Sequence, residues 1–380
     1  MSEQKVNVAF FLPTLEVGGT ERNVVNLVNN IDTEHYTVSL VLGNIHGDFV
    51  NQVRQDIVIV NLKASYSVGL FFALVQYFKI QKPDVFVSAF PRINIITIAA
   101  KIFSGVNTKI IITEHSVFSF LPVIAKTFWR GMFARFFMPL LARLLYPKAD
   151  SIVCVSVGIA EDLKKVINTN GNMKVIYNPI IVDKIYQLAD ETVNNVWFSN
   201  PEVSVIIAVG RLVPIKDYPT LLKAFKQVLK NQPARLVILG SGPEKEKLEW
   251  LSSQMGLSES IAFMGFQKNP YKYIKKASVF VLSSLQEGFG NVIIEAMACG
   301  APVVSTDCPV GPGEIIENMK NGILVPVGDE KSMADAILKV LNDPVLAEKF
   351  STAGRERAKF FSVAKSVGEY EKVFDELSHD

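Results

Sequence analysis

Short apolar runs alternate with helical stretches along the first half of the chain. The runs cover residues 6–12, 38–42, 57–62, 85–88, 110–113, 151–156 and 175–176. A short apolar run that ends in polar or turn residues is typical of a strand buried on both faces. Because helical stretches separate several of these strands, the pattern predicts an α/β fold with a parallel, doubly wound sheet.

The same alternation restarts after residue 202. Apolar runs recur at 203–209, 235–239, 261–266, 279–282, 303–305 and 322–325, and helical patterns follow at 332–342, 344–357 and 361–377. Residues 180–202, between the two series, are polar and mixed, which predicts a linker between domains. A chain of 380 residues is long enough for two domains that each bury a core.

The most informative stretch lies at 287–300 and has the sequence EGFGNVIIEAMACG. It follows a predicted strand, and its glycine-bearing loop precedes a predicted helix over 292–299, which Asn291 can cap. The N-terminus of such a helix offers N–H groups and about half a positive charge to an anion. Glu287 and Glu295 frame that terminus, an arrangement suited to the phosphates and hydroxyls of a nucleotide-sugar. The competing interpretation is an ordinary strand–loop–helix junction with two solvated carboxylates.

Two positions in the first half also follow predicted strands. Gly18 and Gly19 precede a predicted helix at 23–29, where a GG pair indicates either phosphate approach or a turn that needs a positive φ. His115 directly follows the strand at 110–113. Ligands gather at the carboxyl ends of strands in open α/β sheets, so His115 holds a favoured position, although an ordinary loop histidine fits the pattern too.

Composition narrows the range of functions. The formal net charge of +2 argues against nucleic acid as the main partner. The three cysteines have neither zinc-site nor CxxC spacing and fit a reducing cytosol, and the four histidines argue against a His-rich metal centre. We expect neither a signal peptide nor a transmembrane helix, because the N-terminal segment carries an acid and no uncharged apolar stretch reaches about 18 residues.

Residues 117–147 combine aromatic and aliphatic side chains with bases and contain no acid. The bases are Lys126, Arg130, Arg135 and Arg143. This basic amphipathic pattern predicts contact with an anionic membrane surface, to which each base adds roughly 1 kcal/mol. The alternative is a buried helical hairpin whose arginines reach out to water.

Five motifs occur in a telling order along the chain: GGTER at 18–22, EHS at 114–116, GRLVPIKDYPTLLKAF at 210–225, GSGPEKEKL at 240–248 and EGFGNVIIEAMACG at 287–300. In this order they resemble the retaining glycosyltransferases of family four, over nearly the whole chain. The resemblance implies the GT-B fold, with two Rossmann-like, doubly wound parallel-sheet domains facing a cleft. It places an acceptor-side domain at 1–185, a donor-binding domain at 195–360, and a helix at 361–380 that crosses back to the first domain.

The resemblance also implies roles for five side chains. Arg211 and Lys216, at the spacing usual in the family, would neutralise the leaving nucleoside diphosphate, and a contact of this kind typically supplies about 3 kcal/mol. Glu287 would contact the donor sugar hydroxyls, and its carboxylate could favour an oxocarbenium-like centre. Glu295 would accept hydrogen bonds from the ribose, and His115 would line the donor sugar.

The remaining donor-binding positions that the resemblance implies are Gly18, Gly19, Gly240, Phe289, Gly290 and Asn291. The backbone N–H groups at 289–291 would meet the diphosphate, and the GG pair would approach it on closure. EHS stands where EHN or QHN is frequent, which leaves the role of the histidine intact. The sequence at 307–316 resembles a subgroup without a GGIPE-type loop and would place Gly313 and Glu314 near the donor sugar.

The implied reaction transfers a sugar with retention of anomeric configuration, without a metal ion or other cofactor. No residue stands out as an enzyme nucleophile, so we expect front-face attack by the acceptor hydroxyl. The expected donor is a UDP-linked hexose or N-acetylhexosamine, with GDP-mannose as an alternative. The expected acceptor is a lipid-linked or surface glycan of capsule or lipopolysaccharide assembly, because residues 117–147 would hold a cytoplasmic enzyme at the inner face of the cell membrane.

Two other functions fit part of the pattern. A GT-B nucleotide-sugar epimerase would share the fold and the donor, but it would turn over the donor without an acceptor. A non-catalytic peripheral membrane partner of a glycan-assembly complex would keep the amphipathic stretch. It would have no need for Arg211, Lys216, Glu287 and Glu295 together.

Overall fold

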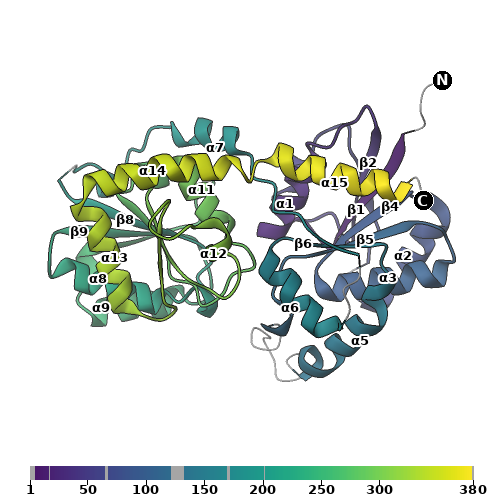
Figure 1. Ribbon diagram of the computed structural model, residues 1–380, viewed down its shortest axis with the longest axis horizontal. Coiled ribbons are helices and arrows are strands. Elements are labelled where there is room, and N and C mark those ends of the chain that lie inside the picture. The colour runs from purple at the N-terminus through teal and green to yellow at the C-terminus, as the bar shows by residue number, and fades with distance from the viewer. Residues whose placement is uncertain are drawn as a thin grey trace. The chain divides into compact units, whose positions relative to one another are not determined.

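The computed structural model describes residues 5–378 except 17, 65–66, 121–131, 169–171 and 201. It also describes the side chains of these residues, apart from those of residues 133 and 134. The chain forms two compact units (Figure 1). Unit 1 comprises residues 1–179 and 363–380, and unit 2 comprises residues 180–362. The chain therefore leaves unit 1 once and returns to it for its last helix.

Unit 1 is built, in its described part, on a seven-stranded parallel sheet with the order β3-β2-β1-β4-β5-β6-β7. Its strands are β1 (Val6–Leu12), β2 (Tyr36–Leu42), β3 (Val58–Asn61), β4 (Val85–Ala89), β5 (Lys109–Glu114), β6 (Ser151–Cys154) and β7 (Met173–Val175). Every residue of the central strand β4 is buried. Helices cover both faces of the sheet, which explains why its strands are continuous apolar runs rather than alternating ones.

Helices of unit 1 lie on the two faces according to the direction of each crossover. The helices are α1 (Gly19–Val28), α2 (Ser67–Gln81), α3 (Pro91–Ser104), α5 (Met138–Leu145), α6 (Val157–Ile167) and α15 (Val363–Ser378). α1 and α15 cover one face, and α2, α3, α5 and α6 cover the other (Figure 1). From β1 to β3 the strands are added toward one edge of the sheet, whereas β4 lies on the other side of β1. Because crossovers between parallel strands are right-handed, this change of direction across the sheet places α2 on the opposite face from α1.

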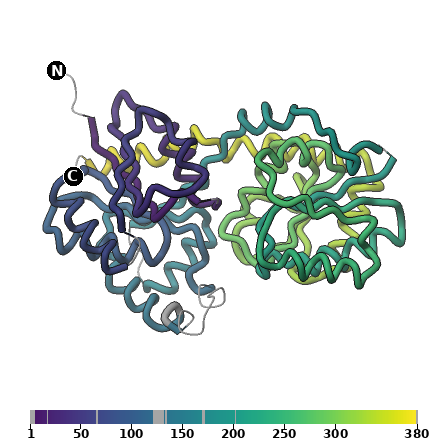
Figure 2. The backbone as a smooth tube through the Cα atoms, turned by 180° about the vertical axis from the view of Figure 1, so that it is seen from behind, coloured from purple at the N-terminus to yellow at the C-terminus, as the bar shows by residue number. Residues whose placement is uncertain are grey.

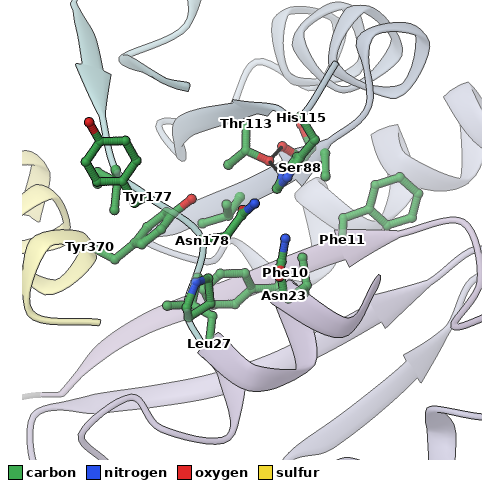
Figure 3. Close-up of a pocket in the computed structure, with 15 residues that line it drawn as sticks. Phe10, Phe11, Asn23, Leu27, Ser88, Thr113, His115, Tyr177, Asn178 and Tyr370 are labelled. Carbon is green, nitrogen blue, oxygen red and sulfur yellow. Dashed lines mark hydrogen bonds between the residues drawn. The ribbon is translucent and has the colours of Figure 1, made fainter. Parts of the chain in front are cut away.

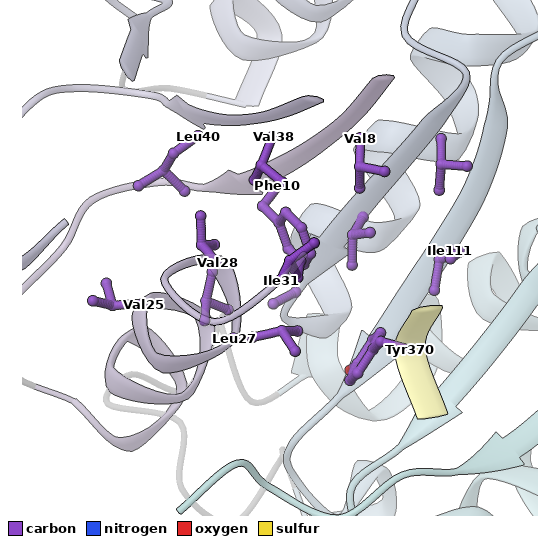
Figure 4. Close-up of a cluster of buried hydrophobic side chains, with 14 of the residues drawn as sticks. Val8, Phe10, Val25, Leu27, Val28, Ile31, Val38, Leu40, Ile111 and Tyr370 are labelled. Atoms are coloured by element: carbon purple, nitrogen blue, oxygen red, sulfur yellow. The ribbon is translucent and has the colours of Figure 1, made fainter. Parts of the chain in front are cut away.

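The core on the α1 side joins segments from both ends of the chain. Phe10 of β1 and Leu27 of α1 pack with Tyr370 of α15 in one buried cluster (Figure 4). Figure 2 shows the yellow α15 running beside the purple N-terminal strands of this unit. α15 is therefore a structural part of unit 1 although more than 180 residues of unit 2 precede it.

Unit 2 has a six-stranded parallel sheet within its described residues, with the order β10-β9-β8-β11-β12-β13. Its strands are β8 (Ser204–Val209), β9 (Ala234–Leu239), β10 (Ile261–Gly265), β11 (Val279–Leu282), β12 (Val303–Thr306) and β13 (Ile323–Val325). All strands of both sheets begin and end within two residues of the apolar runs in the sequence. The prediction of two doubly wound parallel sheets is thus confirmed.

Helices of unit 2 also form two layers. The helices are α7 (Val182–Ala189), α8 (Tyr218–Leu229), α9 (Lys245–Gln254), α10 (Tyr271–Lys276), α11 (Asn291–Cys299), α12 (Pro312–Ile315), α13 (Glu330–Asn342) and α14 (Pro344–Lys359). The predicted linker at 180–202 is wrong, because α7 in this stretch packs against α10 and α11. The apolar side chains of Val182, Ile185 and Ala189 form its buried face, and polar neighbours mask that pattern in the sequence.

Candidate functional site

Strands β8 and β11 lie side by side in the sheet of unit 2, at the point where the strand order reverses. β9 and β10 extend the sheet on one side, and β12 and β13 extend it on the other. Loops that leave two such strands diverge and form a crevice at the carboxyl ends, where ligands of open α/β sheets bind. Arg211 and Lys216 follow β8, whereas Glu287 and Glu295 follow β11. The fold thus brings the two most specific motifs to one edge of one sheet.

Lys216 and Glu287 form an ion pair at this edge. Lys216 Nζ lies 2.5 Å from Glu287 Oε1, and the Ser284 hydroxyl donates to the same oxygen at 2.6 Å. The Lys216 and Glu287 side chains are only 17% and 12% exposed, so solvent screens the pair less than it screens a surface ion pair. Within the described residues Glu287 Oε2 accepts no hydrogen bond, which leaves it available to a ligand hydroxyl.

Hydrogen bonds hold the loop that carries Glu287. The Ser283 hydroxyl donates to the carbonyl of Lys216 at 2.8 Å. The carbonyl of Ser284 accepts from Thr306 Oγ1 at 2.6 Å and from Cys308 Sγ at 3.1 Å. Sequence reasoning did not single out these four residues. Their common signal is that each lies at the carboxyl end of β11 or β12, the edge where the ligand is expected.

Arg211 differs from Lys216 in its surroundings. Its side chain is exposed at the end of β8, and in the described part of the chain its guanidinium has no hydrogen-bond or ion-pair partner. Beside it Tyr218 is buried and donates to the carbonyl of Gly210 at 3.1 Å. Burial, with a contribution from the charge of Glu287, raises the pKa of Tyr218. The edge therefore holds one paired cation and one that can bind an anion directly.

Gly240 lies at the contact between the loops that follow β8 and β9. Its φ is +142°, and a Cβ atom there would lie 1.9 Å from the carbonyl oxygen of Gly210. Its N–H donates to the carbonyl of Gly265 at 2.8 Å. Any larger residue would separate the two loops, so this glycine has a packing role. Its predicted contact with the donor stays a prediction.

The N-terminus of α11 differs from the predicted cap. Gly290, with a φ of +101°, is the N-cap residue and provides no side-chain hydrogen bond to the helix. Asn291 is the first residue of the helix itself. The prediction of an Asn291 cap is wrong because the positive φ of Gly290 turns the chain directly into the helix. The Phe289 ring is buried and lies edge-on to Phe361, with 5.4 Å between ring centroids. Only backbone of Phe289 can therefore meet a ligand.

Three further predicted residues lie in this part of unit 2. Glu295 is half-buried one turn into α11, and Tyr271 Oη lies 3.5 Å from its Oε1. Gly313 and Glu314 belong to the short helix α12. The carbonyl of Glu314 accepts from Arg357 Nη2 at 2.6 Å, which attaches α12 to α14. Their roles at the donor sugar stay predictions.

His115 of unit 1 lines a pocket at the carboxyl ends of β1, β4 and β5 (Figure 3). The pocket is small, with a cavity volume of about 20 Å³, and it is partly open to solvent. Its polar lining includes Asn23, Ser88, Thr113 and Asn178, and its apolar lining includes aromatic rings from β1 and α15. This lining offers both hydrogen-bonding and apolar contacts at the strand ends.

Thr113 determines the hydrogen-bonding state of His115. The Thr113 hydroxyl donates to the carbonyl of Ser88 at 3.1 Å, and His115 Nε2 lies 3.1 Å from the same hydroxyl oxygen. Because that hydroxyl has given its only proton to Ser88, Nε2 must donate, and Nδ1 is the acceptor. Nδ1 is buried and has no hydrogen-bond partner in the described residues. Burial lowers the pKa of His115 to about 4, so the ring is neutral.

Glu114, beside His115, was not singled out in the sequence. It is 1% exposed, and its Oε1 accepts from Tyr146 Oη at 2.5 Å and from Asn94 Nδ2 at 2.8 Å. Asn94 also donates to the carbonyl of Thr113 at 3.0 Å. Burial raises the pKa of Glu114 to about 7, although these hydrogen bonds oppose the shift. The signal for this residue is a carboxylate at the last position of a buried strand.

Gly18 and Gly19 do not need a positive φ. Gly18 is the N-cap of α1 with an extended φ of −157°, and neither glycine has a left-handed backbone. α1 begins at Gly19 rather than at residue 23, and the extended Gly18 precedes it as the N-cap. A Cβ atom on Gly18 would lie 2.1 Å from Glu21 Oε2, whereas Gly19 faces open space. Their approach to phosphate stays a prediction.

Residues 117–120 and 132–147 of the predicted membrane segment are described. Lys126 and Arg130 lie outside the described residues. Arg135 is exposed, and Arg143 is exposed while its Nε donates to the carbonyl of Val166 in α6 at 2.6 Å. Four large apolar side chains here are between 53% and 60% exposed, namely Phe136, Phe137, Leu140 and Leu144. In this described part α5 buries Met138 and Ala142 and exposes the apolar side chains just named, so it is amphipathic rather than wholly buried.

The described residues offer neither a metal-binding cluster nor a membrane-spanning helix. They contain no group of three or more His, Cys, Asp or Glu side chains that could hold a metal ion. None of the helices in the described part is long and apolar enough to cross a membrane.

Comparisons with known proteins agree with this arrangement of motifs. A family model described as Glycosyltransferase Family 4 matches residues 17–184, and one described as Glycosyl transferases group 1 matches residues 190–357. Together they cover the first part of unit 1 and nearly all of unit 2.

Three individual proteins show the extent of the likeness. A Campylobacter jejuni protein named N-acetylgalactosamine-N,N'-diacetylbacillosaminyl-diphospho-undecaprenol 4-alpha-N-acetylgalactosaminyltransferase is 30% identical, over 95% of this chain and 97% of its own. A second C. jejuni protein, an alpha-1,4-N-acetyl-D-galactosaminyltransferase named for an undecaprenol-linked glycan, is 27% identical over 98% of this chain and 99% of its own. The crystal structure of Anabaena HepE with UDP and glucose has a TM-score of 0.78 at 19% identity, covering 97% of this chain and 99% of HepE.

Proposed function

The chain belongs to the glycosyltransferases of family 4 and has the GT-B fold, and we propose that it moves a sugar from a nucleoside diphosphate to a lipid-linked glycan acceptor. The main support is the group at the switch point of unit 2. There Lys216 and Glu287 are paired at 2.5 Å beside the exposed Arg211. Two cations and a carboxylate at one strand edge match a substrate that combines phosphate with sugar hydroxyls.

The acceptor proposal rests on the relatives. Two proteins that match the chain over nearly its whole length are named as transferases of N-acetylgalactosamine to undecaprenol-linked glycans. We therefore propose a polyprenyl diphosphate glycan as the acceptor. The same names favour an N-acetylhexosamine as the transferred sugar, and the UDP in the HepE crystals favours UDP as its carrier.

The geometry of unit 2 supports the proposed roles. The leaving diphosphate gains negative charge as its bond to the sugar breaks, and Arg211 and Lys216 would stabilise that charge in the transition state. Lys216 would exchange part of its pairing with Glu287 for the phosphate. Glu287, released in part from the ammonium, would accept from a sugar hydroxyl, and Glu295 would accept from the ribose.

The proposed chemistry retains the anomeric configuration without a metal ion. The acceptor hydroxyl oxygen bonds to the anomeric carbon on the face that the diphosphate leaves, and the hydroxyl proton passes to the departing phosphate oxygen. Cationic side chains would supply the charge stabilisation that a metal ion supplies elsewhere. Isolation of a covalent glycosyl-enzyme from a slow fluorosugar donor would contradict this front-face step.

We also propose that α5 and residues 135–137 before it rest on the inner face of the cell membrane. The support is the exposed apolar row from Phe136 to Leu144, with Arg135 beside it. A membrane-embedded polyprenyl acceptor would require the enzyme at that surface. Binding would combine the burial of apolar side chains with attraction to anionic lipid headgroups.

Substitution of Lys216 tests the donor site. Lys216→Ala should lower the rate of sugar transfer about 10²- to 10³-fold, because one charge contact to the leaving group is removed. The exposed Lys226 on α8 supplies the matched control, and Lys226→Ala should leave the rate unchanged. The assay follows transfer from UDP-N-acetylgalactosamine, UDP-N-acetylglucosamine, UDP-glucose and GDP-mannose to a short polyprenyl diphosphate glycan.

The outcomes separate the alternatives. Equal rates for the two lysine variants would contradict the assigned donor site. Donor turnover that needs no acceptor and inverts a sugar hydroxyl would instead identify an epimerase. Thermal stabilisation by one nucleotide-sugar, lost in Glu295→Ala, would identify the donor class.

A further inference from the structure

A second exposed apolar surface of unit 1 lies on α2 and α3. These helices pack against each other, α3 packs against α5, and all three cover the same face of the sheet (Figure 1). Five large apolar side chains are exposed on them: Val68, Phe72 and Ile80 on α2, and Ile102 and Phe103 on α3. We name these five residues the α2–α3 face. Neither the donor site nor the sheet packing uses them.

Aromatic contacts join the two helices at this surface. The Phe71 ring centroid lies 5.2 Å from that of Phe72 and 5.3 Å from that of Phe103, both edge-on. Phe72 is 62% and Phe103 is 73% exposed. Exposed aromatic rings gathered in one patch mark interaction sites more often than scattered apolar residues do. The patch therefore indicates a surface that something apolar covers.

The charges on and near α2, α3 and α5 indicate what kind of surface covers the α2–α3 face. α2, α3 and residues 132–148 contain six bases, Lys79, Arg92, Lys101, Arg135, Arg143 and Lys148, and neither Asp nor Glu. An isologous pair of chains would oppose these bases to one another, which is unfavourable. An anionic bilayer offers both an apolar interior to the aromatic rings and negative headgroups to the bases.

We propose that the α2–α3 face is a second membrane contact of unit 1, next to the contact at α5. This inference rests on the proposed membrane role of α5. Contact through one amphipathic helix leaves a domain free to rotate about the helix axis, whereas contact through three neighbouring helices fixes its tilt. The carboxyl edge of the sheet, with His115 and its pocket, is then held at one orientation and height above the lipid.

Vesicle co-sedimentation of the full chain tests this contact. The α2–α3 variant is Phe72→Ser/Phe103→Ser, and the α5 variant is Leu140→Ser/Leu144→Ser. Trp250→Ser/Val345→Ser is the matched control, because these apolar residues of unit 2 are also exposed. Vesicles contain phosphatidylglycerol with phosphatidylcholine, or phosphatidylcholine alone. We expect the α2–α3 variant to bind the anionic vesicles at least tenfold more weakly than wild type, and the control to bind normally.

A charge variant tests the same contact without removing an aromatic ring. Lys79→Glu/Lys101→Glu should weaken binding to anionic vesicles at least tenfold, with thermal unfolding and UDP binding unchanged. Wild-type affinity of both the α2–α3 variant and the charge variant, with loss of binding in the α5 variant, would overturn this inference and leave the proposed function intact. Concentration-dependent self-association lost only in the α2–α3 variant would also overturn it, because a second copy would then be the occupant.

Discussion

At the scale of single residues, the Thr113 hydroxyl determines which ring nitrogen of His115 carries the proton. It gives its proton to the carbonyl of Ser88 and accepts from His115 Nε2, so the acceptor nitrogen Nδ1 remains for a ligand. A buried acceptor without a donor is unfavourable. A sugar hydroxyl or an ordered water that donates to Nδ1 would remove that cost, which supports the proposed role of His115 in substrate binding.

Thr113→Val should remove this control of the His115 tautomer. Valine has a similar shape but neither donates nor accepts, so Nε2 loses its partner and the ring can exchange its proton. We expect sugar transfer to fall about tenfold, since a lost neutral hydrogen bond costs about 1 kcal/mol or slightly more. Nitrogen chemical shifts of the imidazole report the tautomer. Thr113→Ser should restore both the shifts and the rate, and unchanged shifts in Thr113→Val would refute the assignment.

Glu114 and His115 give opposite pH dependences to the stability of unit 1. Burial raises the pKa of Glu114 to about 7, above its ordinary value, so its contribution to stability is present at low pH and is lost as pH rises. Burial lowers the pKa of His115 to about 4, so its contribution is present above about pH 6.5 and is lost as pH falls. In the window where both groups titrate, the two effects partly cancel.

Glu114→Gln should therefore expose the dependence that comes from His115. We expect the free energy of unfolding of this variant to decline from about pH 6.5 to about pH 4, more steeply than that of wild type. Denaturant unfolding across this range measures the slope. The double variant Glu114→Gln/His115→Asn should lose it again. A slope equal to that of wild type in Glu114→Gln would contradict the raised pKa of Glu114.

At the scale of elements, the loops at the carboxyl edge of unit 2 depend on contact between backbones. The loop after β9 meets the loop after β8 at Gly240, where a Cβ atom would lie 1.9 Å from the carbonyl oxygen of Gly210. The loop after β11 contacts the loop after β8 through Ser283 and is held by β12 through Ser284. The position of the Lys216–Glu287 pair thus depends on several strand ends together.

Two glycine substitutions separate close backbone approach from simple flexibility. Gly240→Ala should destabilise unit 2 by about 2–4 kcal/mol, because the clash adds to a φ of +142°. Gly368→Ala in α15 meets no atom within 4 Å and should stabilise unit 1 by about 0.5–1 kcal/mol. Thermal unfolding measures both. Equal effects would show that the contact between Gly240 and Gly210 contributes nothing.

At the scale of the whole molecule, the chain builds two units with separate sheets and separate cores. Unit 1 is discontinuous, because α15 follows unit 2 in the sequence. Phe374 of α15 packs edge-on to Phe10 and Tyr36, and Tyr36 Oη donates to Asp375 Oδ1 at 2.5 Å. Loss of α15 would therefore expose the core of unit 1, although the helix lies at the far end of the chain.

The three helices α2, α3 and α5 also act at this scale. α2 and α3 each bury apolar side chains and expose others, so neither shows the simple one-sided pattern of a surface helix, whereas α5 does. Only the fold shows that their exposed apolar residues lie on helices of one unit that pack against one another. The proposed membrane contact is a property of these helices together.

The sequence by itself determined where the strands lie, because strands covered on both faces must be continuous apolar runs, and their ends are visible as polar or glycine residues. It also determined the family, since the order of the motifs around Arg211, Lys216, Glu287 and Glu295 is specific. It did not show α7, whose buried face is masked by polar neighbours, nor the Gly290 cap, which depends on a backbone angle.

Only the tertiary structure decided which of these residues meet. The Lys216–Glu287 pair joins positions 71 residues apart, and Glu114 contacts Tyr146 across 32 residues. Hydrogen bonds and pKa shifts depend on distance and burial in space, which local sequence patterns do not contain. Periodicity and turn chemistry act between near neighbours, so they fix the elements. The chemistry of the site arises where distant strand ends converge on one edge of a sheet.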